Sequence, residues 1–198
     1  MNAAVGFKRA RAYRAADEQG TASGAADVVR FWQAAHTDWF SHDPAFDRRF
    51  RECFLDLHFS TARRERDAWA ETPEGSLALL ILLDQFPRNA FRGTSHMYAT
   101  DALARHFARM ANAAGYIDFI DPELRLFFCL PFSHSEDIAD QDLSVELNTR
   151  LGPAEQSHAE GHRDIIRRFG RFPHRNPLLL RETTSEEQAF LDRGGFTG

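Results

Sequence analysis

Three short phrases of the sequence concentrate residues that could carry acid–base or anion chemistry. They are "DQFPRN" at residues 84–89, "SHSED" at residues 133–137 and "RFGRFPHRN" at residues 168–176. A histidine close to a carboxylate can serve as a general base, and arginine offers paired N–H donors that match a carboxylate or a phosphate. If the fold brings the three phrases together, they predict a polar pocket for a small anionic ligand.

The residues of this predicted site fall into two groups by their chemistry. In the catalytic hypothesis His134 or His162 is the general base, oriented by Glu136 or Asp84. The predicted ligand-binding residues are Arg88, Asn89, Asp137, Gln141, Arg171, His174, Arg175 and Asn176. A purely structural network of buried charges would use the same residue types, so the sequence alone leaves open whether the protein is an enzyme.

The apolar stretch "SLALLILLDQF", residues 76–86, has no polar face, which predicts a helix buried on all sides. Asp84 is its only ionisable residue, and an unpaired carboxylate in apolar surroundings is costly. Asp84 therefore requires a cationic partner, either Arg88 or an arginine of residues 168–176. The prolines of "QFPRN" and "RFPHRN" are each predicted to end a core-facing helix.

Helix 134–151 is predicted to begin with a capping box of Ser133 and Glu136. Glu136 then shares its face with the leucines of this helix and points inward. His134 would lie in the first turn, where the helix dipole disfavours the protonated imidazole. Ser133 and Ser135 stand beside this histidine, but no nucleophile-elbow motif surrounds them.

Helix 153–169 is predicted to aim another histidine into the protein. At about 100° per residue, His162 falls on the same apolar stripe as Ile166. His158 lies one turn earlier and completes an i, i+4 pair of metal-ligand spacing, yet no HExxH or CxxC motif accompanies it. No metal site is predicted, and the lack of a glycine-rich phosphate loop or dinucleotide fingerprint predicts no cofactor.

Helix start signals recur along the chain. Asp43-Pro44, Thr72-Pro73 and Asp121-Pro122 each place a capping residue before a proline at the first helical position. The predicted helices cover residues 25–35, 44–59, 61–70, 73–86, 97–114, 121–130, 134–151, 153–169 and 185–192. No alternating β-branched segment competes with them. The sequence predicts an all-α fold, with a basic, alanine-rich tail over residues 1–24 and one domain of about nine antiparallel helices over residues 25–198.

The composition of the chain disfavours some classes of binding partner. The chain of 198 residues carries a net charge of −5, whereas residues 162–176 hold five arginines against one acid. Such a concentrated basic patch suits a small anion better than a duplex, so no nucleic-acid partner is predicted. The longest apolar run, Leu77–Leu83, is too short to span a membrane. Two cysteines in apolar helical surroundings are typical of reduced thiols in a cytoplasmic protein.

Longer motifs carry a resemblance to a known family. The phrases "LALLILLDQFPRNAFRGT", "YATDALA", "LPFSHSED" and "HRDIIRRFGRFPHRN" occur in this order, and "FDRRF" and "TSEEQAFL" extend the match. Together they resemble the uncharacterised bacterial family catalogued as domain of unknown function 924. The resemblance implies a tetratricopeptide-like helical fold, whose groove would suit a peptide or protein partner as the alternative to a small anion. The sequence departs from the family at Leu180, where glycine is usual, so the turn there is expected to differ.

Overall fold

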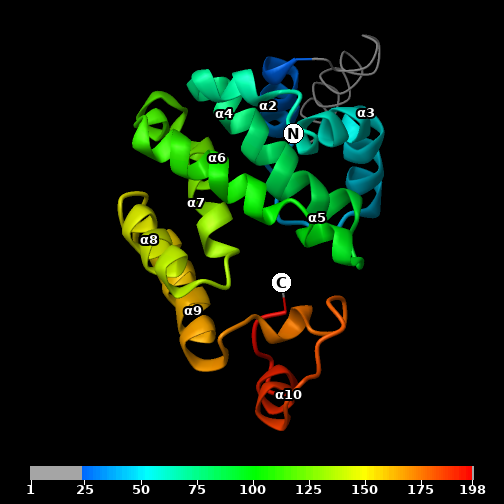
Figure 1. Ribbon diagram of the computed structural model, residues 1–198, viewed down its shortest axis with the longest axis vertical. Coiled ribbons are helices and arrows are strands. Elements are labelled where there is room, and N and C mark those ends of the chain that lie inside the picture. Colours follow the sequence, from blue (N-terminus) through cyan, green and yellow to red (C-terminus); the bar gives the residue numbers. More distant parts are fainter. Residues whose placement is uncertain (1–23, 198) are drawn as a thin grey trace, which may run out of the picture.

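The structure is a computed structural model that describes residues 24–197, and every regular element in this range is a helix (Figure 1). The all-α, single-domain prediction is thereby confirmed. The predicted tail, residues 1–24, lies outside the described residues except for Gly24. The α-helices are α2 (Ala25–Ala34), α3 (Pro44–Ala62), α4 (Pro73–Leu80), α5 (Phe86–Ala90), α6 (Asp101–Ala113), α7 (Leu126–Ser133), α8 (Ile138–Thr149), α9 (Pro153–Phe169) and α10 (Ser185–Asp192). None of these helices is both long and apolar enough to cross a membrane.

Two of the predicted start signals form as expected. The Asp43 side chain accepts a hydrogen bond from the backbone N–H of Ala45 at the start of α3. The Thr72 hydroxyl accepts one from the N–H of Gly75 at the start of α4. Such caps satisfy N–H groups that have no partner inside the helix, which is why both helices begin where the sequence indicates.

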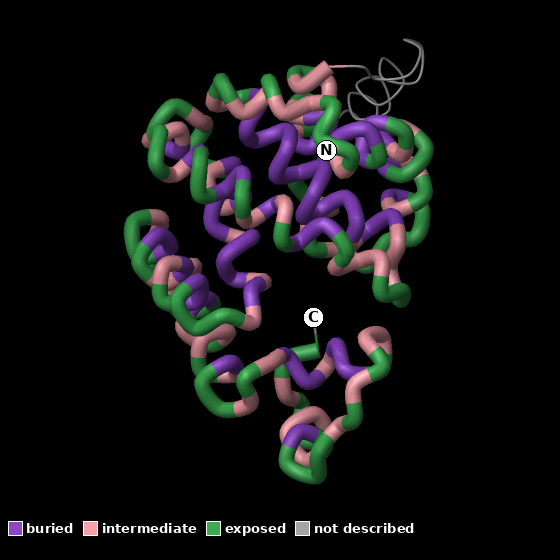
Figure 2. The backbone as a smooth tube through the Cα atoms, viewed as in Figure 1, coloured by how far each residue is buried: buried purple, intermediate pink, exposed green. Residues whose placement is uncertain are grey.

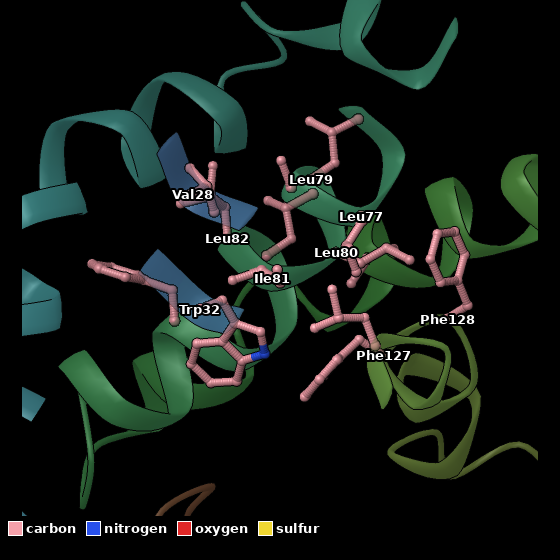
Figure 3. Packing of buried hydrophobic residues seen from close by; sticks show 14 of the residues in the cluster. Val28, Trp32, Leu77, Leu79, Leu80, Ile81, Leu82, Phe127 and Phe128 are labelled. Carbon is pink, nitrogen blue, oxygen red and sulfur yellow. The ribbon is translucent and has the colours of Figure 1, made fainter. Parts of the chain in front are cut away.

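The core forms around the run Leu77–Leu83, and the burial of all seven residues confirms the predicted central helix (Figure 2). Val28 and Trp32 of α2 pack against it from one side, and Phe127 of α7 packs from another (Figure 3). Burying a large apolar side chain contributes about 1.5–3 kcal/mol relative to leaving it exposed. This core therefore fixes the position of the polar residues that follow it in the chain.

Pro87 does not end the central helix, contrary to the prediction. The chain stays helical through α4, a π-helical turn η2 (Ile81–Gln85) and α5. Proline lacks an N–H and its ring clashes with the carbonyl four residues earlier, and a wider π turn relieves both problems. The carbonyl of Leu83 instead accepts a hydrogen bond from the Thr100 hydroxyl at 2.5 Å, and that of Leu82 accepts one from His58 Nδ1 at 2.9 Å.

The predicted capping box of Ser133 and Glu136 is also wrong. Helix α7 continues through Ser133, His134 is its C-terminal cap residue, and α8 begins only at Ile138. The Gln141 side chain holds this break by donating to the backbone carbonyls of Ser133 at 2.8 Å and Ser135 at 2.6 Å. His134 consequently lies at the C-terminal end of a helix, where the dipole favours rather than disfavours a protonated imidazole.

Leu180 adopts a left-handed backbone with φ of 54° and is 94% exposed. This conformation costs a residue with a Cβ roughly 1–2 kcal/mol, which explains why glycine suits the position. We expect Leu180→Gly to raise the free energy of unfolding by about 0.5–1 kcal/mol in urea denaturation, the gain being reduced by the entropy of the unfolded chain.

The reverse change at Gly115 provides the control for Leu180→Gly. Gly115 has φ of 69°, and a Cβ added there would meet open space, so backbone strain alone decides the effect. We expect Gly115→Leu to lower the free energy of unfolding by a similar amount. A Leu180→Gly variant that is less stable than the parent would contradict the strain argument.

Candidate functional site

A cavity of about 500 Å³ lies between α5, α7 and α9 and is completed by loop 39–42, Tyr98, the turn at 174–175 and Phe196. Its lining includes residues from all three of the phrases considered above, 84–89, 133–137 and 168–176. Of the predicted site residues, six line it: Arg88, Asn89, His134, His162, His174 and Arg175. The fold therefore brings together half of the predicted set, from positions almost ninety residues apart in the chain.

Asp84 is buried beneath this cavity and is surrounded by donors. Its Oδ1 accepts from His134 Nδ1 at 2.8 Å and lies 3.1 Å from Arg88 Nη1, and its Oδ2 accepts from Gln85 Nε2 at 2.6 Å. Burial raises the pKa of Asp84, but the positive charge of Arg88 and the hydrogen bonds outweigh burial and lower it to about 2. The predicted cationic partner of Asp84 is therefore present, and of the two alternatives it is Arg88.

Arg88 also binds Asp101, at the start of α6. Its Nη1 and Nη2 donate to the two carboxylate oxygens of Asp101 at 2.9 and 3.1 Å, and Nη1 donates further to the backbone carbonyl of Asp84 at 2.6 Å. A bidentate pair of this kind is strong and fixes the guanidinium in one plane. Arg88 is thus held by two carboxylates, and its charge is largely compensated within the protein.

His134 is arranged as a base that faces the cavity. Burial and the neighbouring Arg88 lower its pKa, although Asp84 acts in the opposite direction, so the imidazole is neutral at pH 7. Asp84 is ionised and accepts hydrogen bonds only, so the proton of His134 must reside on Nδ1. The other ring nitrogen, Nε2, then carries a lone pair and can accept a proton.

Arg175 differs from Arg88 because its charge lacks a close partner. Its guanidinium carbon lies 4.7 Å from the centre of the Tyr98 ring and 4.5 Å from that of Phe172, and the residue is 7% exposed. Within residues 24–197 its side chain makes no hydrogen bond, and Asp101 approaches only to 4.0 Å. Burial and the positive charge of Arg88 lower the pKa of Arg175, which nevertheless remains a cation.

Two further histidines, His162 and His174, line the cavity together with Arg88 and Arg175. Burial lowers the pKa of His162 to about 3 and that of His174 to about 4, so both are neutral at pH 7. Their rings contact Phe196, with centroid separations of 4.6 and 5.2 Å respectively. The Nδ1 atoms of both histidines are buried and lack hydrogen-bond partners among the described residues. Both residues line the cavity, so their rings border the space that a ligand would occupy.

The other six predicted residues do not line the cavity. Asp84 lies behind it, as described. Arg171 donates to Glu187 at 2.6 Å, and Asn176 donates to the same carboxylate at 3.3 Å, so both anchor α10 instead of binding a ligand. They face α10 because Gly170 reverses the chain after α9 with φ of 70°.

The remaining three have structural roles around the break between α7 and α8. Glu136 accepts from the backbone N–H of Phe172 at 3.0 Å and from Arg181 at 2.9 Å. Asp137 caps α8 by accepting from the N–H of Ala139 at 2.8 Å. Gln141 caps the end of α7. None of these three residues lines the cavity, and their printed hydrogen bonds support its wall. The Oε1 atom of Gln141 is buried and lacks a hydrogen-bond partner among the described residues.

Sequence reasoning missed several residues that shape the site, chiefly Tyr98 and Asp101. Both belong to the phrase "YATDALA", which had been assigned to the interior of one helix over residues 97–114. In the structure a short 3₁₀ turn, η3 (Ser95–Tyr98), precedes α6, so Asp101 occupies the first turn of a helix and not its middle. The signal that could have located it was Thr100-Asp101, a polar pair typical of a helix start.

No group of three or more histidine, cysteine or acidic side chains within residues 24–197 is placed to hold a metal ion. The charged and titratable groups of the cavity include arginine and histidine side chains, with the buried carboxylates of Asp84 and Asp101 bound to Arg88.

The chain is similar to proteins of a known family. Residues 28–195 match the bacterial proteins of unknown function designated DUF924. A solved structure, that of the protein of unknown function ATU0120 from Agrobacterium tumefaciens, is similar with a TM-score of 0.84 and 58% sequence identity, over 86% of this chain and 97% of that one. Among curated proteins none matches. The match across nearly the whole described chain shows that the protein belongs to the bacterial family DUF924.

Proposed function

We propose that the protein binds a small anionic ligand in the central cavity, with Arg175 as its anchor. The observation that carries this proposal is the guanidinium of Arg175, which is almost completely buried yet makes no hydrogen bond within the described chain. A buried charge without such partners is strongly destabilising. An anion in the cavity would supply the missing acceptors, and a guanidinium matches a carboxylate or a phosphate in a bidentate arrangement.

The balance of charge at this end of the cavity supports an anion. Asp101 is committed to Arg88 through both oxygens, and Asp84 is committed to Arg88 and His134. Arg175 is left as a cation of the cavity whose side chain makes no hydrogen bond to the residues that the structure describes, with its buried Nε lacking a partner. The neutral His162 and His174 can each donate one N–H to the anion, or take up a proton to balance a second negative charge.

A second candidate function, acid–base catalysis on the bound anion, is favoured by the pairing of Asp84 with His134. The carboxylate holds the proton on Nδ1 and orients the ring, which is the role of the acidic member in known histidine-dependent catalytic groups. Nε2 would then remove a proton from the ligand or from a water beside the anionic group. The hydroxyl of Ser133 is 2.6 Å from that of Ser144 in a buried hydrogen bond, and within residues 24–197 it is not hydrogen-bonded to the imidazole of His134.

Nuclear magnetic resonance of the histidine side chains tests the binding proposal. Acetate, inorganic phosphate or octanoate is added at pH 7 and constant ionic strength, and we expect the imidazole signals of His162 and His174 to shift together and saturate. A nearby negative charge favours the protonated imidazole, so the pKa values of both histidines should rise in the complex and binding should tighten as the pH falls.

His58 serves as the internal control. It is buried and neutral like His162, with its pKa lowered by burial to about 4, but it is bonded to Leu82 and does not line the cavity. Its signals should stay unchanged during the titration. The proposal is overturned if none of the three anions gives a saturable shift, or if His58 responds in parallel with His162 and His174.

A further inference from the structure

The wall of the cavity changes from apolar to charged along α7. Leu126, Leu130 and Ser133 line it at a helical spacing, and His134 follows at the end of the helix. With a rise of 1.5 Å per residue, Leu126 and Ser133 are separated by about 10 Å along the helix axis. One end of α7 therefore presents leucine side chains to the cavity, and the other end presents the proposed anion site.

Two aromatic residues extend the apolar end. Trp39 and Phe40 line the cavity and lie against Phe127 of α7, with ring centroids 4.8 and 6.4 Å away. Phe40 is 65% exposed, which places this end of the cavity at the surface. An exposed aromatic side chain that borders a cavity offers apolar contact to whatever enters it.

Helix α9 lines the cavity beside α7 with Ala154, Glu155, His158, Ala159 and His162. Both α7 and α9 pack on α8 through short connections, so they run in the same direction (Figure 1). Ala154 and Glu155 thus lie near the leucine end of α7, whereas His162 lies near its charged end. The carboxylate of Glu155 repels an anion at the apolar end. Arg92, which contacts loop 41–42, is already paired with Asp47 at 2.7 Å.

We propose that the ligand of the anion site is an amphipathic organic anion, whose charged group binds Arg175 and whose apolar body lies along α7 toward Trp39 and Phe40. This inference rests on the proposed function, because Arg175 must hold the charged group. A medium-length acyl chain or an aromatic body fits a wall of leucine and aromatic side chains that extends about 10 Å along α7. The charged group is a carboxylate or a phosphate monoester, both of which suit a guanidinium.

Isothermal titration calorimetry on the full chain compares acetate, octanoate and octyl phosphate. Each methylene that is buried tightens binding by roughly fourfold, so we expect octanoate to bind at least roughly 50-fold more tightly than acetate. The ratio of the dissociation constants of octanoate and octyl phosphate shows whether the site prefers a carboxylate or a phosphate. Equal affinities for acetate and octanoate would overturn the amphipathic ligand and leave the anion site standing, whereas binding of none of the three anions would overturn both.

Phe40→Ser supplies the matched variant, because an exposed side chain can be shortened with little effect on folding. We expect it to weaken octanoate binding by roughly tenfold and to leave acetate binding unchanged, since acetate reaches only the charged end. Leu130→Ser should act in the same direction, because Leu130 of α7 also lines the cavity. Octanoate affinity that is unchanged in both variants would show that the chain does not lie along α7 and would overturn the inference.

Discussion

Replacement of Arg175 by methionine is expected to abolish anion binding and to leave the fold intact. Loss of two charge-assisted hydrogen bonds weakens binding by roughly 100-fold or more. The free energy of unfolding should fall by less than about 1 kcal/mol or should rise, because the variant removes a buried charge that has no hydrogen bond to lose. Methionine retains contact with Tyr98 and Phe172. Calorimetry with octanoate or phosphate and urea denaturation measure the two effects separately.

Arg171→Met is the matched control, four residues away and in the same arginine-rich phrase. Arg171 holds the carboxylate of Glu187, a buried residue of α10, and this partner keeps the pKa of Glu187 lowered to about 2. We expect Arg171→Met to lower the melting temperature and to leave anion affinity unchanged. If instead Arg175→Met unfolds the protein, Arg175 belongs to a structural network and the binding proposal fails.

Asp84→Ala is expected to lower the free energy of unfolding by about 3–5 kcal/mol, the typical cost of removing one partner of a buried ion pair. Asp84 is 1% exposed, and its loss leaves Arg88 short of one carboxylate and His134 without an acceptor for Nδ1. Because its pKa is lowered in the folded state, Asp84 stabilises the protein above its ordinary pKa, and this contribution disappears as the pH falls toward 2. Urea denaturation at pH 7 measures the loss, and the difference between the two proteins should narrow in acid.

Asp142→Ala serves as the control for Asp84→Ala. Asp142 is a surface carboxylate that pairs with Arg167 at 3.1 Å and Arg163 at 3.6 Å. Exposed pairs contribute little, so this variant should change the free energy of unfolding by less than about 1 kcal/mol. If Asp84→Ala lowers the free energy of unfolding by as little as Asp142→Ala does, Asp101 alone is sufficient to hold Arg88.

The secondary structure could be predicted wherever local chemistry decides it. The limits of helix 153–169 and of helix 185–192 agree with the structure, and the start at Pro44 follows from its cap. Prediction failed where a tertiary contact replaces a local one. Pro87 was expected to end its helix, but Thr100 binds the carbonyl that proline leaves unpaired, and the helix continues.

In the candidate site, too, local chemistry could be predicted and tertiary contacts could not. The demand of Asp84 for a nearby cation follows from a carboxylate in an apolar helix, and Arg88 four residues later meets it. The roles of Arg171 and Arg175 could not be separated in this way, since both lie in one arginine-rich phrase with similar neighbours. Their surroundings diverge only because Arg171 meets Glu187 of α10, whereas Arg175 enters a space between Tyr98 and Phe172.

The sequence by itself determined that this protein is a single all-α domain around Leu77–Leu83, with a buried aspartate that must be paired. These properties depend on hydrophobic periodicity, helix caps and the cost of an isolated charge, all of which act within a few residues. Only the tertiary structure decided that Arg175 is buried without a side-chain hydrogen bond within residues 24–197, and that leucine and aromatic side chains line the same cavity. Whether a donor has a partner depends on residues far apart in sequence, which packing alone brings together.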